Sequence, residues 1–169
     1  ITSSDIQELY RSIHSLSGEL IPAENFYIAL FDPVSELISF PYSVDQFDDS
    51  APVMTVEHGL TGYVIRTGQP ILATQEVFDK LLQEGKVDLV GTAGVDWLGV
   101  PLIVNGRIIG VMAVQSYSEE VHYDRKDLNV MEIVSTQVAQ VIERKRLEEE
   151  IRILSLTDDL TRLWNRRGF

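Results

Sequence analysis

Residues 97–116, WLGVPLIVNGRIIGVMAVQS, decide the fold of this chain. Two runs rich in valine and isoleucine flank Asn105 and Gly106, and an Asn-Gly pair between such runs predicts a β-hairpin with a type I′ turn. In the second run, RIIGVMAVQS, both alternating sets of residues are largely apolar. A strand with two apolar faces is typical of the middle of a sheet that is covered on both sides. We therefore expect a central antiparallel hairpin between two layers.

The residues before this hairpin predict a second hairpin and several short helices. Apolar residues recur at helical spacing from Ser4, which forms a plausible capping box with Gln7, and Gly18 is expected to end this helix. Two runs rich in aromatic and branched residues are separated by the turn signal DPVS. The expected elements are a helix over 4–17, strands over 25–31 and 36–42, a helix over 59–67, a strand over 70–73 and a helix over 76–83.

A long helix is expected after the central hairpin. From Asp124 the helical pattern continues for about thirty residues without glycine or proline. Its apolar residues form two stripes that are out of phase with each other, an early one of Met131, Val134, Val138 and Val141 and a later one of Leu147, Ile151 and Leu154. The early stripe fits two interpretations, packing on the chain's own sheet or a second register of a helix pair. The later stripe predicts a homodimer through the N- and C-terminal helices, arranged as a four-helix bundle.

Composition excludes several classes of function. The chain has 169 residues, no cysteine and a net charge of −12, with −13 in residues 1–142 and +1 in residues 143–169. An acidic domain repels a phosphate backbone, so nucleic-acid binding is not expected. Without cysteine there is no thiolate chemistry, and His14, His58 and His122 lack ligand spacing, so no metal site is predicted. The apolar runs are too short to span a membrane, and we expect a cytoplasmic module that makes no membrane contact.

The order of these segments resembles a known family. Residues 24–142 contain FYIALFDPVSELISF, GLTGYVIRTGQPI, the central hairpin and a closing helix, and this order resembles that of a GAF domain. The resemblance implies an α+β fold, in which an antiparallel sheet carries helices packed on one face, a small-molecule pocket on the other and a long C-terminal helix. On this basis residues 1–142 are assigned to a GAF sensory domain.

The resemblance also suggests where a ligand would bind. The expected pocket walls are Phe40, Tyr42, Leu60, Thr61, Thr92, Asp96, Val111 and Ala113. The helix N-terminus at Thr61 is a candidate anion site. Family members that bind cyclic nucleotides have Asp, Thr and Glu at the three positions where this chain has Pro41, Gly94 and Ala113. Cyclic-nucleotide binding is therefore not expected. Two interpretations remain open, a pocket for an unidentified small molecule and a face filled by the domain's own side chains.

The last thirteen residues, TDDLTRLWNRRGF, resemble the start of a GGDEF domain, the catalytic part of diguanylate cyclases. The positions that agree with the family's pattern are Asp158, Leu160, Thr161, Leu163, Asn165, Arg166, Arg167 and Phe169. The resemblance implies that residues 157–169 are the truncated start of that domain and that residues 143–156 are a linker or signalling helix. Mg²⁺, GTP and every catalytic residue would belong to the part beyond Phe169, so no catalytic residue or cofactor is expected in this fragment.

These observations predict a regulatory role. The first hypothesis is a sensory and dimerisation module that regulates a C-terminal diguanylate cyclase, which converts GTP to cyclic di-GMP in bacterial signal transduction. The alternative is a ligand-free dimerisation domain attached to a degenerate GGDEF domain that only binds nucleotide. The sequence begins ITSSDIQ without methionine, and we expect both ends to lie within a longer polypeptide. An enzyme built from residues 1–169 alone is disfavoured, since no nucleophile, carboxylate pair or metal cluster emerges from the motifs.

Overall fold

The computed structural model describes residues 3–49 and 52–167, with side chains described for 4–49 and 52–156. The elements in chain order are α1 (Ser3–Leu20), β1 (Asn25–Asp32), β2 (Leu37–Val44), β3 (Met54–Thr55), α2 (Gly59–Thr67), β4 (Ile71–Thr74), α3 (Gln75–Gln83), β5 (Asp96–Val104), β6 (Arg107–Ser116) and α4 (Arg125–Arg167). The strands form one antiparallel sheet in the order β3-β2-β1-β6-β5-β4. The expected α+β class and antiparallel sheet are confirmed.

The central hairpin forms as its Asn-Gly pair predicts. Asn105 has a φ of 51° and Gly106 a φ of 74°, the left-handed conformation that both central positions of a type I′ turn require. Val104 and Arg107 pair across this turn, and β6 lies between β1 and β5 in the sheet. The hairpin therefore supplies two adjacent inner strands, to which the other strands are added.

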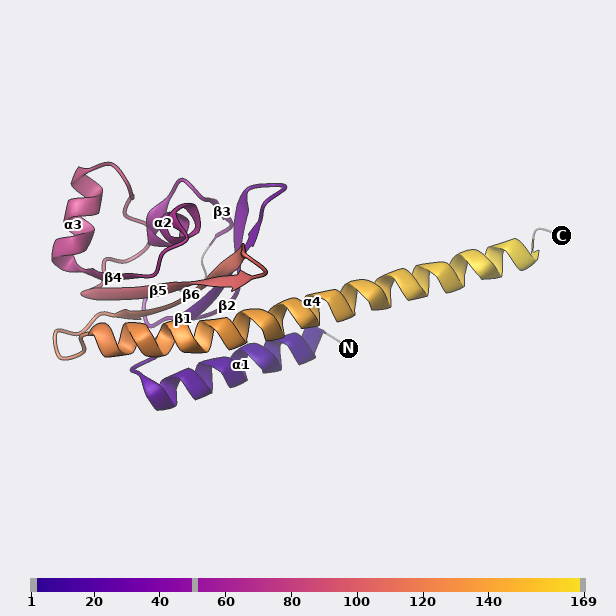
Figure 1. Ribbon diagram of the computed structural model, residues 1–169, viewed down its shortest axis with the longest axis horizontal. Helices are drawn as coiled ribbons and strands as arrows, with labels where there is room; N and C mark the ends of the chain where they lie inside the picture. Colours follow the sequence, from indigo (N-terminus) through magenta and orange to yellow (C-terminus); the bar gives the residue numbers. More distant parts are fainter. Residues whose placement is uncertain (1–2, 50–51, 168–169) are drawn as a thin grey trace.

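Helices lie on both sides of the sheet. Figure 1 shows α4 running beneath the strands with α1 alongside it, while α2 and α3 lie on the opposite side. The larger core is on the α4 side, where Phe26, Leu98 and Met112 from the strands belong to one buried cluster with Met131 and Ile142 from α4. We call this surface of the sheet the helix face, and the opposite surface the α2 face. The early apolar stripe of the long helix packs against the chain's own sheet, since Met131 and Val138 are buried there.

One local prediction is wrong, and one short strand was not predicted. Gly18 does not end the first helix, because α1 continues to Leu20 and the N–H of Ile21 still donates to the carbonyl of Ser17. Burial of Ser17 and Ile21 against the body outweighs the propensity cost of glycine, roughly 1 kcal/mol. The short strand β3 was not expected, and its two residues carry too little pattern to identify it.

The long helix leaves the body of the domain. Figure 1 shows its C-terminal half projecting beyond the sheet. Leu147, Ile151 and Leu154 are 48%, 66% and 63% exposed. Both predicted domain boundaries, after residues 142 and 156, fall inside the continuous helix α4. Residues 158–167 of the GGDEF-like motif continue this helix, but their side chains and all of Phe169 lie outside the described residues.

Candidate functional site

The α2 face encloses a cavity of about 320 Å³. Its floor comes from β1, β2, β4 and β5, one side comes from the start of α2, and the loop over residues 88–95 closes the other side. Glycine and alanine in this loop allow it to approach the sheet. A Cβ atom on Gly94 would lie 2.4 Å from Nε2 of Gln115 and 2.9 Å from the carbonyl oxygen of Ser116. Larger residues at this position would push the loop away from β6.

An aromatic wall borders the cavity. It consists of Tyr27, Phe40 and Trp97, with the rings of Tyr27 and Phe40 in an edge-to-face contact at 5.5 Å between centroids. The indole of Trp97 lies across Gly99, where a Cβ atom would come within 2.0 Å of a ring carbon. Gly99 thus lets the indole lie flat against the sheet. The wall offers flat apolar surfaces on which a ring could stack.

The hydroxyl of Tyr27 orients this wall. Nε1–H of Trp97 donates to the Tyr27 hydroxyl oxygen at 3.0 Å, and that oxygen lies 2.7 Å from Oγ1 of Thr61. An indole nitrogen can only donate, so the Tyr27 proton is available for Thr61. Burial raises the pKa of Tyr27 to about 12. The network therefore joins β1, β5 and α2 through a hydroxyl that stays neutral at physiological pH.

Carboxylates also line the cavity. Asp48 accepts hydrogen bonds from the N–H of Thr92 at 3.0 Å and from its hydroxyl at 3.1 Å. Asp45 accepts from the N–H groups of Phe47 and Asp48 and from the hydroxyl of Tyr117. These contacts tie the segment after β2 to the loop over 88–95. Burial, reinforced by Asp45, also raises the pKa of Tyr117.

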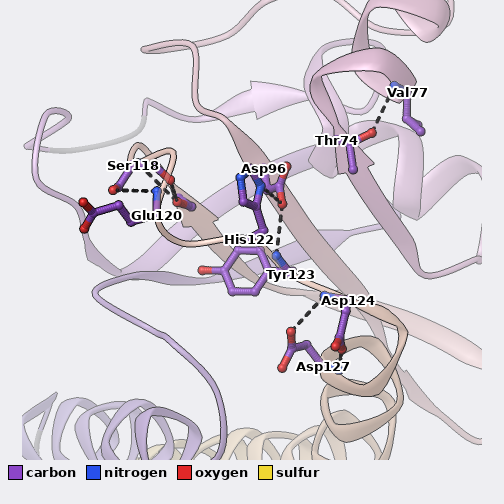
Figure 2. Close-up of polar contacts among 10 residues, drawn as sticks. Thr74, Val77, Asp96, Ser118, Glu120, His122, Tyr123, Asp124 and Asp127 are labelled. Carbon is purple, nitrogen blue, oxygen red and sulfur yellow. Dashed lines mark hydrogen bonds and ion pairs between the residues drawn. The ribbon is translucent and has the colours of Figure 1, made fainter.

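A further cavity residue, Asp96, contacts the segment that leads into α4. Its side chain is 3% exposed, and Oδ2 accepts from the N–H of Tyr123 at 3.0 Å and lies 3.1 Å from Nδ1 of His122 (Figure 2). Asp124, which follows Tyr123 in the chain, caps α4 by accepting hydrogen bonds from the N–H groups of Lys126 and Asp127. Asp127 in turn accepts from the N–H of Asp124 at 2.9 Å. Asp96 is thus the direct link between the cavity and the N-terminus of α4.

The structure gathers most, but not all, of the residues predicted for the pocket. Phe40, Leu60, Thr61, Thr92 and Asp96 line the cavity. Val111 and Ala113 lie on the same face of the sheet but are fully buried in the small core under α2, away from the cavity lining.

The prediction that Tyr42 lines the pocket is wrong, because Tyr42 lies on the other face of the sheet. Phe40 and Pro41 together oppose Ala29 in the β1–β2 ladder, which makes a β-bulge. The extra residue reverses the alternation of side chains, so Tyr42 lies on the helix face although Phe40 lies on the α2 face. There its hydroxyl lies 2.9 Å from Nδ1 of His14.

Several lining residues were not predicted. They include Tyr27, Trp97, Gln115 and the carboxylates Asp45, Asp48 and Asp88. The alternation of β1 carries a signal for Tyr27, because this residue must face away from Phe26 and Ile28. The carboxylates lie in loops, where no periodic pattern indicates which way a side chain points.

The three histidines lie in separate environments. His14 stacks on Phe26, His58 lies 2.7 Å from Asp88, and His122 contacts Asp96. Among the residues with described side chains, no group of three or more histidine, aspartate and glutamate residues is arranged to hold a metal ion. In the same part of the chain, no helix is both long and apolar enough to cross a membrane.

Comparison with known proteins agrees with this architecture. No curated protein sequence matches the chain. Similar solved structures include the second GAF domain of DevS from Mycobacterium smegmatis, with 15% identity, a TM-score of 0.65 and coverage of 86% of this chain and 98% of that one. The GAF domain/HD domain protein from Geobacter sulfurreducens has 13% identity, a TM-score of 0.63 and coverage of 86% and 96%. The GAF domain of a phosphoenolpyruvate-protein phosphotransferase from Acinetobacter has 13% identity, a TM-score of 0.65 and coverage of 82% of each chain.

These identities establish a shared fold, and a family model adds the assignment. The model of the GAF domain matches residues 3–143, which include α1, the whole sheet and the part of α4 that packs on it. The match covers most of the chain and ends where α4 leaves the sheet. The chain therefore belongs to the GAF domain family, a family of sensory and regulatory modules in signalling proteins.

Proposed function

We propose that this chain is a sensory and dimerisation module that regulates a C-terminal diguanylate cyclase in bacterial signal transduction. The observation that carries the proposal is the continuity of α4, which runs from the back of the sheet to Arg167 without a break. Residues 158–169 resemble the start of a GGDEF domain, and cyclases of that family condense two GTP molecules across a dimer. Control of such a reaction requires control of how two catalytic domains face each other.

The exposed stripe on α4 supports dimerisation. Leu147, Ile151 and Leu154 are apolar, exposed and spaced for a helix pair, and they lie beyond the part of α4 that packs on the sheet. An apolar row of this kind is stabilised when a second helix covers it. We propose that a second copy of this chain does so, and that α1 adds to the bundle.

Asp96 provides a route from the cavity to this helix. A ligand that shifts Asp96 also shifts the N–H of Tyr123, one residue before the capping residue Asp124. Packed helix pairs favour discrete arrangements, so a small displacement at the start of α4 can select between them. The presence of the cavity favours this sensor over a ligand-free dimerisation domain attached to a degenerate GGDEF domain.

The dimer is tested by sedimentation of the chain. The double variant Leu147→Asn/Ile151→Asn is expected to sediment as a monomer at concentrations where the wild type is a dimer. Val34→Asn is the matched control, since Val34 is 92% exposed in the β1–β2 turn, away from both helices. A dimer that persists in the double variant would refute the contact.

Transmission is tested in the full-length protein by changing the phase of α4. Insertion of seven residues after Arg146 rotates the later part of the helix by only about 20° from its original phase, whereas two residues rotate it by about 200°. Cyclic di-GMP formation from GTP should keep its dependence on the signal with seven added residues and lose it with two. Equal responses of both insertions would contradict control through the helix.

A further inference from the structure

We propose that the cavity binds a small aromatic or heteroaromatic amine, neutral or cationic, in preference to an anion. This inference rests on the proposed sensory function and names the class of ligand for its cavity. It follows from the charges that line the cavity, the hydrogen-bonding capacity left on them and the shape of the aromatic wall.

The charges at the cavity are negative. Asp45, Asp48, Asp88 and Asp96 line it, and none of the described lining residues is lysine or arginine. Two basic residues in neighbouring segments are engaged elsewhere. Arg66 of α2 donates to the carbonyls of Val56 and Lys86, and the ammonium of Lys86 pairs with Glu84 at 2.6 Å. A bound anion would therefore meet four carboxylates with no lysine or arginine among the described lining residues, and only Asp88 and Asp96 have a histidine beside them, His58 and His122 respectively.

The N-terminus of α2 does not reverse this balance. Gly59, Leu60 and Thr61 border the cavity, and the sequence suggested an anion there. A helix N-terminus is equivalent to roughly half a positive charge, and its effect fades within one turn. The four carboxylates carry up to four negative charges around the same space, so they dominate the potential that a ligand experiences. Anion binding at the candidate site near Thr61 is therefore disfavoured.

Hydrogen-bonding capacity also favours a ligand that donates. Each oxygen of Asp48 accepts one described hydrogen bond, both from Thr92, and a carboxylate oxygen can accept two. Nε1–H of Trp97 is already used by Tyr27, and the side-chain amide of Gln115 donates to the carbonyl of Thr92 at 3.4 Å. Acceptors therefore remain at the cavity, while two of its side-chain donors are satisfied within the protein.

The aromatic wall selects the body of the ligand. Trp97, Tyr27 and Phe40 present apolar rings to the same cavity that Asp45 and Asp48 line. A flat ring fits against this wall and gains stacking energy, and an attached ammonium gains additional attraction from the ring faces. A molecule that carries both a ring and an amine would satisfy the aromatic residues and the carboxylates of the cavity together.

The inference is tested with compounds that share a ring and differ in charge. Tryptamine, tryptophol and indole-3-acetate, together with benzylamine, benzyl alcohol and benzoate, are compared by thermal shift of the chain. We expect the amines to raise the melting temperature most and the carboxylates not to raise it. Butylamine, which has no ring, controls for attraction to the net charge of −12.

The outcomes separate this inference from the proposed function. Stabilisation by the carboxylates but not the amines would overturn the inference and leave the sensory cavity intact. An equal effect of butylamine and tryptamine would overturn the inference by showing that charge alone attracts the probe. No stabilisation by any of these compounds, nor by a panel of nucleotides and organic acids, would overturn both proposals.

Charge-removing variants locate the binding. Asp48→Asn should weaken tryptamine binding roughly tenfold in calorimetry, because a charge-assisted hydrogen bond is lost. Asp88→Asn should weaken it about twofold to fivefold and disturbs less structure, because Asp88 is exposed and contacts only His58 among its described hydrogen bonds. The control is Asp49→Asn, an exposed neighbour outside the cavity lining. Equal affinity in all three variants and the wild type would overturn the assignment.

Discussion

The helix face and the α2 face of the sheet are built from alternate residues of the same strands, yet the helix face is a packed core while the α2 face encloses the cavity described above. The helix face presents large side chains such as Ile28, Leu98 and Met112, which fill the space under α1 and α4. At neighbouring positions the α2 face has Ala29, Gly99 and other small residues. Small residues let α2 approach the sheet centre, while α3 and loops cover the rest. One face thus provides most of the core, and the other provides space for a ligand.

Truncating a leucine side chain on each face should reveal the largest difference in the free energy of unfolding. Leu98 is fully buried on the helix face, and Leu98→Ala is expected to lower the free energy of unfolding by about 2–5 kcal/mol. Leu60 borders the cavity and is only half-buried, so Leu60→Ala should cost about 1 kcal/mol. Urea unfolding measures both. Equal losses would show that the α2 face is packed as tightly as the helix face.

Replacing a buried alanine by a larger residue should reveal the same contrast between the two faces, with a smaller change in stability. Ala139 of α4 is fully buried, and Ala139→Met is expected to cost about 1–3 kcal/mol because the core has no room for the added atoms. Ala73 is buried on β4 but lines the cavity, so a methionine there can enter open space. Ala73→Met should change the stability by less than about 0.5 kcal/mol. A similar loss in both variants would contradict the difference between the faces.

The pH dependence tests the Tyr27 network of the α2 face. Because the pKa of Tyr27 is raised from 10.0 to about 12, the folded state retains a proton that the unfolded state releases above pH 10. The contribution of Tyr27 is complete below pH 10 and is lost as the pH rises towards 12, by up to about 1.4 kcal/mol per pH unit. Unfolding at pH 9 and pH 11 should therefore show a smaller decrease for Tyr27→Phe than for the wild type. Equal decreases would show that Tyr27 ionises normally in the fold.

The projecting end of α4 should matter least for the stability of the domain. Ile151 lies beyond the part of the helix that packs on the sheet, and its side chain is 66% exposed, so Ile151→Asn removes no contact with the body of the domain. In dilute solution, where any dimer dissociates, the stability should change by less than about 0.5 kcal/mol. Thermal unfolding as a function of protein concentration measures this. A larger loss at the lowest concentration would mean that the end of α4 folds back on the body.

The fold could be predicted from the sequence where a strong local pattern agreed with the packing. The Asn105-Gly106 turn and the alternation of β6 identified the centre of the sheet, because both depend on nearest neighbours in the chain. The helix end at Gly18 was wrong because tertiary burial outweighed the propensity of a single residue. The order of segments indicated the GAF architecture, and the family model agrees with it.

The site was harder to predict than the fold. The positions of Phe40, Leu60 and Thr61 at the cavity could be predicted, the first from the alternation of side chains along a strand and the other two from the start of a helix. Tyr42 was misplaced because the bulge at Phe40 and Pro41 leaves no mark in an alternating pattern. Asp45 and Asp48 reach the cavity through loop contacts with residues more than forty positions away, such as Thr92 and Tyr117. Such long-range contacts depend on the whole fold and cannot be inferred from local spacing.

The most direct test of the central claim, that the α2 face is left open to hold a small molecule, is the thermal shift that tryptamine produces in the wild type and in Ala73→Met. We predict a clear rise in melting temperature for the wild type and none for Ala73→Met, although the two proteins without ligand melt within a few degrees of each other, as expected for a stability difference below about 0.5 kcal/mol. The same rise in both proteins would place the binding elsewhere. If neither tryptamine nor any other compound of the panels above raised the melting temperature of the wild type, the result would contradict the account.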